Sequence, residues 1–125
     1  MEDEARPLPD GSGEAELEAA ADRAAISAIL EARGRNGEAV AALQQALALL
    51  EHVLGANHYE VAVALDRLAT LCRQERRQQD AVPLYNRAID IFERTLGPGN
   101  VRTVTCRANR NRALLEIADE GHGHG

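Results

Sequence analysis

Residues 39–62 read AVAALQQALALLEHVLGANHYEVA, and residues 81–104 read AVPLYNRAIDIFERTLGPGNVRTV. The second stretch repeats the pattern of the first, and a helix-ending glycine recurs at Gly55 and Gly97, an interval that we call one repeat length. The other aligned pairs are Ala39 and Ala81, Leu43 and Tyr85, Ala46 and Ala88, Leu47 and Ile89, Leu49 and Ile91, Glu51 and Glu93, and Leu54 and Leu96. A fixed interval of this kind is typical of stacked repeat proteins, which work by presenting a surface. The sequence therefore predicts a binding scaffold without naming its partner.

The composition favours a single all-α domain. The chain has 125 residues, of which 45% are hydrophobic and only 2% are aromatic. Alanine and leucine dominate the apolar residues, and both are strong helix formers. The formal net charge of −6 argues against a general nucleic-acid or acidic-membrane binder.

The two cysteines and the apolar runs indicate the compartment. Cys72 and Cys106 lie on predicted helices and form neither a metal motif nor a disulfide framework, so we interpret them as small core residues. We see no secretory signal, and no segment approaches the roughly 20 apolar residues that cross a bilayer. We therefore expect a reducing, cytoplasmic setting.

Apolar spacings of three and four residues predict five helices, at about 14–33, 37–54, 58–75, 79–96 and 100–119. Asn36 is a candidate N-cap for the second helix, and Asn57 with Glu60 resembles a capping box for the third. Pro83 is expected in the first turn of the fourth helix, where a missing N–H does least harm.

These helices divide the chain into parts. We expect an acidic disordered tail over 1–13, repeat one over 14–55, repeat two over 56–97, a capping helix over 100–119 and a flexible His/Gly tail over 120–125. The predicted fold is a short all-α solenoid of two helical hairpins plus a C-terminal capping helix.

The fifth helix departs from the repeat. Arg107 and Arg110 stand one repeat length after Leu65 and Leu68, so two expected apolar positions have become cationic. A polar outer face is what the terminal element of a solenoid needs, which favours a cap. The alternative interpretation is a functional arginine patch formed by Arg102, Arg107, Arg110 and Arg112.

Residues 80–100, DAVPLYNRAIDIFERTLGPGN, resemble the kinesin light chain type of tetratricopeptide repeat. The matching residues are Ala81, Pro83, Leu84, Tyr85, Arg87, Ala88, Ile89, Ile91, Glu93, Leu96, Gly97 and Pro98. The resemblance extends loosely over about 14–118 and accounts for a repeat length greater than the ordinary value of about 34 residues. It implies a protein–protein interaction adaptor whose concave groove binds a peptide segment of a partner.

In that family the groove is lined by the first helix of each hairpin. The resemblance therefore points to the following groove residues: Asp66, Arg67, Thr70, Arg73, Asn109 and Arg112. The family often has asparagine, which holds peptide backbone, where this chain has Asp66 and Arg67; Asn109 is the one asparagine retained. The arginines would favour acidic groups or a C-terminal carboxylate on the partner. In the first helix, Ala24, Ala25 and Ala28 would make the groove smooth and weakly polar.

The sequence contains no phosphate-binding loop, paired-cysteine motif or nucleophile elbow, so we predict no enzymatic activity and no cofactor. His52 and His58 are interpreted as solvated, and the two histidines of the C-terminal tail as a poor metal site, so no metal is expected.

Two further hypotheses remain open. The chain could self-associate as a homodimer through its uncapped N-terminal end, where Ile26, Ile29 and Leu30 lie, because two hairpins are fewer than the roughly three repeats that usually bury a solenoid core. The last helix could instead contact nucleic acid through its arginines, although Glu116, Asp119 and Glu120 oppose this.

Overall fold

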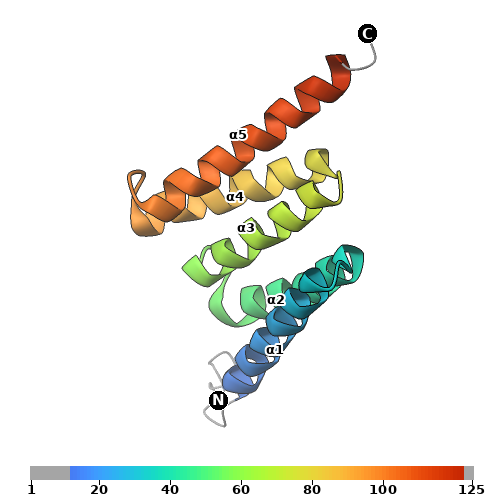
Figure 1. The fold of residues 1–125 in the computed structure, drawn as a ribbon. Coiled ribbons are helices and arrows are strands. Elements are labelled where there is room, and N and C mark those ends of the chain that lie inside the picture. The colour runs from blue at the N-terminus through green and yellow to red at the C-terminus, as the bar shows by residue number, and fades with distance from the viewer. Residues whose placement is uncertain (1–11, 123–125) are drawn as a thin grey trace.

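The computed structural model describes residues 12–122, and all regular structure in that range is helical. The helices are α1 (Ser12–Ala32), α2 (Asn36–Leu54), α3 (Tyr59–Gln74), α4 (Gln78–Leu96) and α5 (Val101–His122). Figure 1 shows α1 and α2 as one antiparallel hairpin, α3 and α4 as a second hairpin stacked on it, and α5 beyond them. The expected all-α solenoid of two hairpins and a further helix is confirmed.

Most helix boundaries fall within two residues of those expected, with corrections at the two ends of the chain. Residues 12 and 13, assigned to the N-terminal tail, belong to α1, and residues 120–122, assigned to the C-terminal tail, belong to α5. The rest of both expected tails, 1–11 and 123–125, lies outside the described residues.

The expected N-caps were wrong. Asn36 is the first residue of α2, and the cap position is Arg35, whose guanidinium binds Glu38. The same arrangement recurs one repeat length later, where Arg77 caps α4 and binds Asp80. In both hairpins, therefore, an acidic side chain at the third position of the second helix binds the arginine at the N-cap of that helix.

The capping box expected at α3 is also replaced. His58, not Asn57, is the N-cap, and its Nδ1 accepts a hydrogen bond of 3.0 Å from the backbone N–H of Glu60. Asn57 instead accepts a hydrogen bond from Arg94. Pro83 lies in the second turn of α4 rather than the first, since α4 starts at Gln78.

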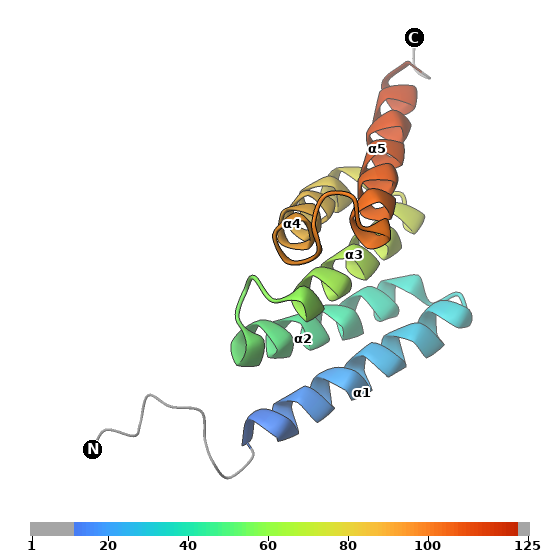
Figure 2. The same cartoon turned by 90° about the vertical axis from the view of Figure 1, so that its left-hand side faces the viewer.

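The connections that leave the two hairpins, from α2 to α3 and from α4 to α5, begin with the same backbone conformation. Gly55 has φ 91° and ψ 157°, and Gly97 has φ 93° and ψ 154°. This region of backbone space is open essentially only to glycine, because a Cβ would clash with the backbone there. The chain therefore turns out of α2 and α4 in the same direction, and the second hairpin lies on the first as Figure 2 shows.

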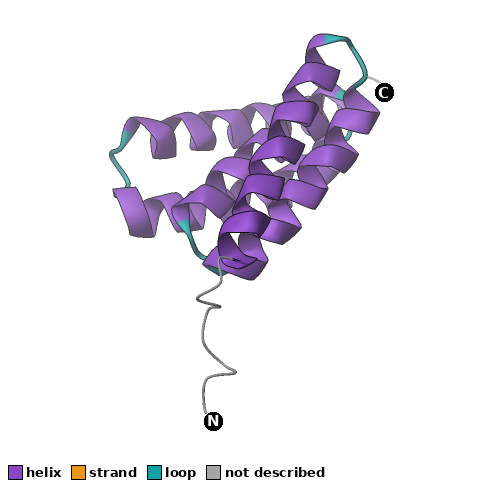
Figure 3. Cartoon of the chain, turned by 90° about the horizontal axis from the view of Figure 1, so that it is seen from below, coloured by secondary structure: helices purple, strands orange, loops and turns teal. Residues whose placement is uncertain are grey.

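The core runs continuously through the stack rather than around one centre. Its largest fully buried side chains include Leu43 on α2, Leu65 on α3, and Tyr85 and Phe92 on α4. In Figure 3 the hairpins are viewed from below, with every loop at a helix end. The helices α3 and α4 contribute most of the buried hydrophobic residues.

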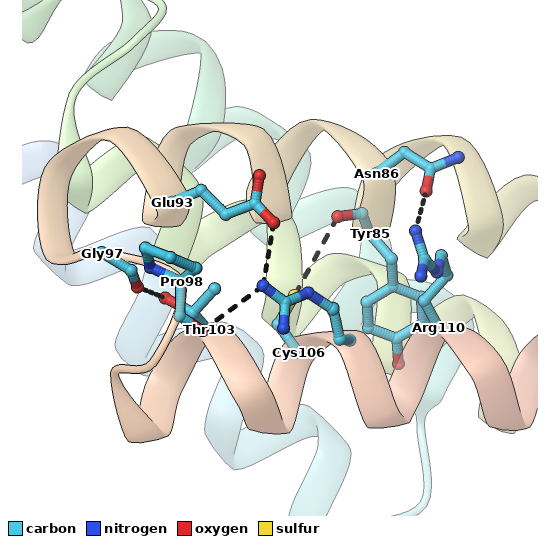
Figure 4. A network of polar contacts seen from close by, with 9 residues as sticks. Tyr85, Asn86, Glu93, Gly97, Pro98, Thr103, Cys106 and Arg110 are labelled. Atoms are coloured by element: carbon cyan, nitrogen blue, oxygen red, sulfur yellow. Dashed lines mark hydrogen bonds and ion pairs between the residues drawn. The ribbon is translucent and has the colours of Figure 1, made fainter.

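Polar links tie successive elements together at repeated positions. Arg87 on α4 donates to the carboxylate of Glu51 and, at 3.3 Å, to the carbonyl oxygen of Ala56. The acceptors one repeat length later are Glu93 and the carbonyl of Pro98, and Arg107 on α5 donates to them at 2.9 and 3.3 Å (Figure 4). The acceptor pair repeats, whereas the arginine comes from a different element each time.

Candidate functional site

An apolar hollow lies between α1 and α3, with side chains of α2 between them. Its volume is about 410 Å³. No Cα atom of α1 comes within 8 Å of a Cα atom of α3, so the two helices leave space between them. We call this hollow the α1–α3 groove; its lining residues are Leu17, Ala20, Ala21, Ala24, Leu43, Ala46, Leu50, Leu54, His58, Glu60, Val63, Ala64 and Arg67.

Small side chains on α1 open the groove. Ala20, Ala21 and Ala24 recur at spacings of one and three residues, so they lie on one side of the helix. A methyl group fills little of the space between two helices, while leucines from α2 line the interior. Of the three alanines expected to make the groove smooth, Ala24 lines it, whereas Ala25 and Ala28 are exposed and outside its lining.

Polar groups of α3 and its cap form the rim of the groove. Glu60 and Arg67 are exposed, as is His58. Within residues 12–122, no ion pair is recorded for Arg67, so its charge is available to a ligand. The groove can therefore take apolar side chains inside and an anionic group at its edge.

Asp66 faces the other neighbour of α3. It lines a separate hollow of about 400 Å³ with Asn100, Val101, Arg102 and Thr105 at the start of α5. Its Oδ1 atom is buried and has no hydrogen-bond partner among the described residues. Burial raises the pKa of the Asp66 carboxyl, and the nearby Cys106 thiol and the charge of Arg102 partly oppose that shift.

The Cys106 thiol beside Asp66 is chemically inert. It is fully buried, and burial together with the neighbouring carboxylate raises its pKa to about 12. A thiol that stays protonated at neutral pH is a poor nucleophile and a poor metal ligand. Cys72 is also buried, and both cysteines are free thiols, in agreement with their interpretation as core residues.

Thr70 and Arg73 make contacts within the protein. The Thr70 hydroxyl lies 2.7 Å from the Tyr85 hydroxyl, which ties α3 to α4. The Arg73 Nε atom lies 3.4 Å from Oε1 of Glu116, which ties α3 to the end of α5. Arg73 also lines a polar hollow of about 430 Å³ with Glu116, Asp119 and Glu120, where acidic groups already surround its charge.

The last two expected groove residues lie on α5. Asn109 is half-buried and Arg112 is exposed. Neither lines the three hollows described above, and each of those hollows holds only one of the residues Asp66, Arg67 and Arg73. The polar residues expected to line one groove are therefore spread over several surfaces of the stack.

The arginines of α5 do not form one free patch. Arg107 binds Glu93, and the Nη1 atom of Arg110 donates to Asn86 at 3.1 Å, so both point toward α4 (Figure 4). The guanidinium of Arg102 lies 5.7 Å from the centre of the Tyr59 ring. Three of the four arginines are thus held by neighbouring elements, and Arg112 is exposed.

The sequence indicated Ala24 and Arg67 as groove residues, but it did not indicate the apolar interior of the α1–α3 groove. The signal was present as small residues on α1 that stand one repeat length before charged ones on α3: Ala24 corresponds to Asp66, and Ala25 to Arg67. Only the distance between α1 and α3 turns alanines of α1 into the wall of a groove.

The described residues also bear on metal binding and on membrane insertion. Among residues 12–122, no three His, Cys, Asp or Glu side chains are placed to hold a metal ion. In the same range, no helix combines the length and apolarity needed to span a membrane.

The family comparison agrees with the repeat geometry. The sequence pattern of the family described as "Tetratricopeptide repeat" matches residues 17–94, which is more than half of the chain and covers both hairpins almost entirely. No match to a curated protein was found. Proteins of this repeat type generally mediate protein–protein interactions and are typically not enzymes. With the match, the fixed repeat length and the stacked hairpins taken together, the chain belongs to the tetratricopeptide repeat family.

Proposed function

We propose that this protein is an interaction adaptor that binds a peptide segment of a partner protein in the α1–α3 groove. The observation behind the proposal is the combination of an apolar interior of about 410 Å³ with a polar rim at His58, Glu60 and Arg67. Recognition sites in proteins commonly pair a mostly apolar cavity with a few oriented polar groups. Burial of apolar side chains of the segment would supply most of the affinity.

The partner segment is proposed to contain one or more apolar side chains followed by an acidic group. The acidic preference rests on Arg67 alone, because the charge of Arg73 already faces Glu116. Arg112 is exposed and can add to attraction at longer range. Asp66, Thr70 and Asn109 are proposed to act on the surrounding surface rather than inside the groove.

The remaining parts of the proposal concern the repeat type, the cellular setting and other kinds of ligand. The resemblance to the kinesin light chain type agrees with the paired glycine turns at Gly55 and Gly97. A reducing, cytoplasmic setting agrees with two buried free cysteines. We propose no catalysis and no cofactor. We also propose no nucleic-acid ligand, because most of the arginines of α5 are held by α4 and by Tyr59.

The test is a selection of random peptides on the full chain, followed by affinity measurements on the selected peptides. Ala21→Trp places a large ring in the groove and is expected to weaken binding about tenfold or more. Ala25→Trp is the matched control, because Ala25 is exposed on the same helix outside the lining. Equal effects of the two variants, or the absence of any selected peptide, would exclude the groove as the binding site.

A second variant tests the chemistry of the segment. Arg67→Ala is expected to lower affinity for acidic peptides more than for their amidated or Asn/Gln versions, while Arg112→Ala should affect both groups nearly equally. If Arg67→Ala weakens both peptide groups by the same factor, the acidic preference is wrong even though the groove binds peptide.

A second candidate function is self-association through the N-terminal end. The exposure of Ile26 (41%) and Ile29 (52%) on α1 supports it, whereas Leu30 is half-buried against the core. Sedimentation of Ile29→Glu beside the unsubstituted chain tests it. A dimer that is lost in this variant would support pairing through α1, and a dimer that is unaffected would exclude it.

A further inference from the structure

α5 has a face that its counterparts bury. Ser27 on α1 donates from its hydroxyl to the carbonyl of Ala39 on α2 at 2.7 Å, so Ser27 and Ala20, which lies two turns before it, face the other helix of their own hairpin. Ala20 and Ser27 are 2% and 1% exposed. We call these positions and their equivalents one and two repeat lengths later the hairpin row. On α3 the hairpin row includes Ala62 and Ala69, both fully buried.

On α5 the same row is open. Its members are Val104 and Asn111, Ala108 and Leu115 stand one turn after each of them, and all four are exposed. Val104 is 48% and Leu115 is 65% exposed. The difference arises because α1 and α3 each have a following antiparallel helix, whereas no helix follows α5 within the described residues (Figures 1 and 2).

The residues on the open row are not those of an ordinary solvated face. Six large apolar side chains among the described residues are exposed, and four of them lie on α5: Val101, Val104, Leu114 and Leu115. Val101, Val104, Ala108, Asn111, Leu115 and Ala118 follow one another at alternating spacings of three and four. That spacing forms a continuous seam along a helix and is the pattern by which two helices pair.

The charges along α5 specify what can cover the seam. Its first half contains Arg102, Arg107 and Arg110, Arg112 follows just after the middle, and no acidic residue precedes Glu116. The acidic residues Glu116, Asp119 and Glu120 all lie in the last turns. Two copies of α5 in antiparallel orientation place the basic half of each beside the acidic end of the other, whereas parallel copies would place like charges together.

We infer that α5 pairs antiparallel with α5 of a second copy of this chain, so that each copy supplies the missing hairpin helix of the other. Asn111 lies at the middle of α5 and hence near the two-fold axis, where its amide can bond to the same amide of the second copy. The Val104 end of each seam then faces the Leu115–Ala118 end of the other. This inference does not rest on the peptide-binding proposal and uses the opposite end of the stack from pairing through α1.

The first experiment is sedimentation of the full chain over a series of concentrations. The expected species at high concentration has about twice the chain mass of 13.5 kDa. Leu115→Glu is expected to raise the dimer dissociation constant on the order of 100-fold, since each copy would bury an unpaired charge in an apolar seam. The matched control is Ile29→Glu, which adds the same charge at another exposed apolar residue, on α1, and should leave the dimer intact. Circular dichroism should show equal helix content in all three proteins, because both side chains are exposed.

The second experiment tests the orientation by disulfide cross-linking. Asn111→Cys should form a covalent dimer under mild oxidation, because the two copies of this residue lie near the axis. Ala118→Cys should not, since the two copies would lie about 20 Å apart along the helices at about 1.5 Å per residue, beyond the reach of a disulfide. The native cysteines are buried and provide the unreacted background.

Each outcome decides the inference. A dimer that Leu115→Glu dissolves, together with cross-linking at residue 111 but not at 118, supports it. A monomer at all concentrations, a dimer lost only in Ile29→Glu, or cross-linking at residue 118 would overturn it.

Discussion

α1 and α3 hold the same place in successive hairpins, one repeat length apart, but they differ in how much of their surface is buried. Ala20 and Ser27 are the buried members of α1 among its described side chains, whereas eight residues of α3 are buried. Within the described residues α1 is approached only by α2, while α2, α4 and α5 all approach α3. The burial of a helix of this repeat type therefore follows its neighbours in the stack together with its own amphipathic pattern, which is stronger in α3 than in α1.

The sharpest test of that comparison is a pair of alanine variants at equivalent positions. Leu65 on α3 is fully buried, and Arg23, its equivalent on α1, is exposed. Leu65→Ala should lower the free energy of unfolding by about 2–5 kcal/mol, because it removes buried methyl groups and leaves a cavity. Arg23→Ala should change it by less than about 0.5 kcal/mol. Urea denaturation measures both, and similar losses would mean that α1 has a neighbour that the described residues do not contain.

The short turns inside the two hairpins differ at the residue that takes the left-handed conformation. Gly34 has φ 77°, and Arg76, which stands one repeat length later, has φ 62°. A left-handed conformation costs roughly 1–2 kcal/mol for a residue with a Cβ. Gly34→Ala should therefore lower the free energy of unfolding by about 1 kcal/mol, all of it from backbone strain, because no atom lies within 4 Å of the added Cβ.

The converse variant completes this comparison. Arg76→Gly should raise the free energy of unfolding by about 0.5 kcal/mol, since the relief of strain exceeds the added freedom of the unfolded chain. Thermal unfolding of both variants is the measurement. A loss of stability in Arg76→Gly would show that the Arg76 side chain contributes more than its backbone strain costs.

The two hairpins differ in polarity at Asp66, which corresponds to Ala24 on α1. Because burial raises the pKa of Asp66 above its usual 3.8, the folded state holds this proton more tightly than the unfolded state. The contribution of Asp66 to stability is therefore most favourable below the unfolded pKa and is lost as pH rises through the folded pKa. Asp66→Asn should leave stability nearly unchanged at low pH and raise it at pH 7.

The measurement is the difference between the urea midpoints of the variant and the unsubstituted chain as pH rises through the acidic range. The difference should grow with pH and then level off. A difference that shrinks with rising pH would mean that the Asp66 carboxylate is stabilised in the folded protein.

The smallest expected effect concerns the arginines that bind the repeated acceptors. Arg107 and Glu93 have side chains that are 33% and 40% exposed, so their ion pair contributes at most about 1 kcal/mol. Arg107→Leu restores the residue type found at Leu65 and should change the free energy of unfolding by less than about 0.5 kcal/mol, since a new apolar contact replaces the ion pair. Chemical denaturation at low and high salt is the check: the unsubstituted chain should lose more stability with salt than the variant does.

The helices and their order could be predicted from the sequence, because the periodicity of Leu, Ala and Ile and the recurring glycines at Gly55 and Gly97 are local signals. The caps could not, since Arg35 stands at the cap position in place of the expected Asn36, and His58 in place of the expected Asn57. The candidate site was harder still. Thr70 and Arg73 share α3, as the periodicity predicts, yet their partners Tyr85 and Glu116 lie on α4 and α5.

The sequence by itself determined that this chain is a pair of copied hairpins followed by one further helix, because the repeat, the helix formers and the turn glycines act over a few residues at a time. Only the tertiary structure decided which surfaces are available. The separation of α1 from α3 turns Ala20, Ala21 and Ala24 into a groove, and the absence of a helix after α5 in the described range leaves Val104 and Leu115 exposed. Both follow from how the helices stack, and stacking depends on contacts between residues far apart in the chain, which a local pattern does not encode.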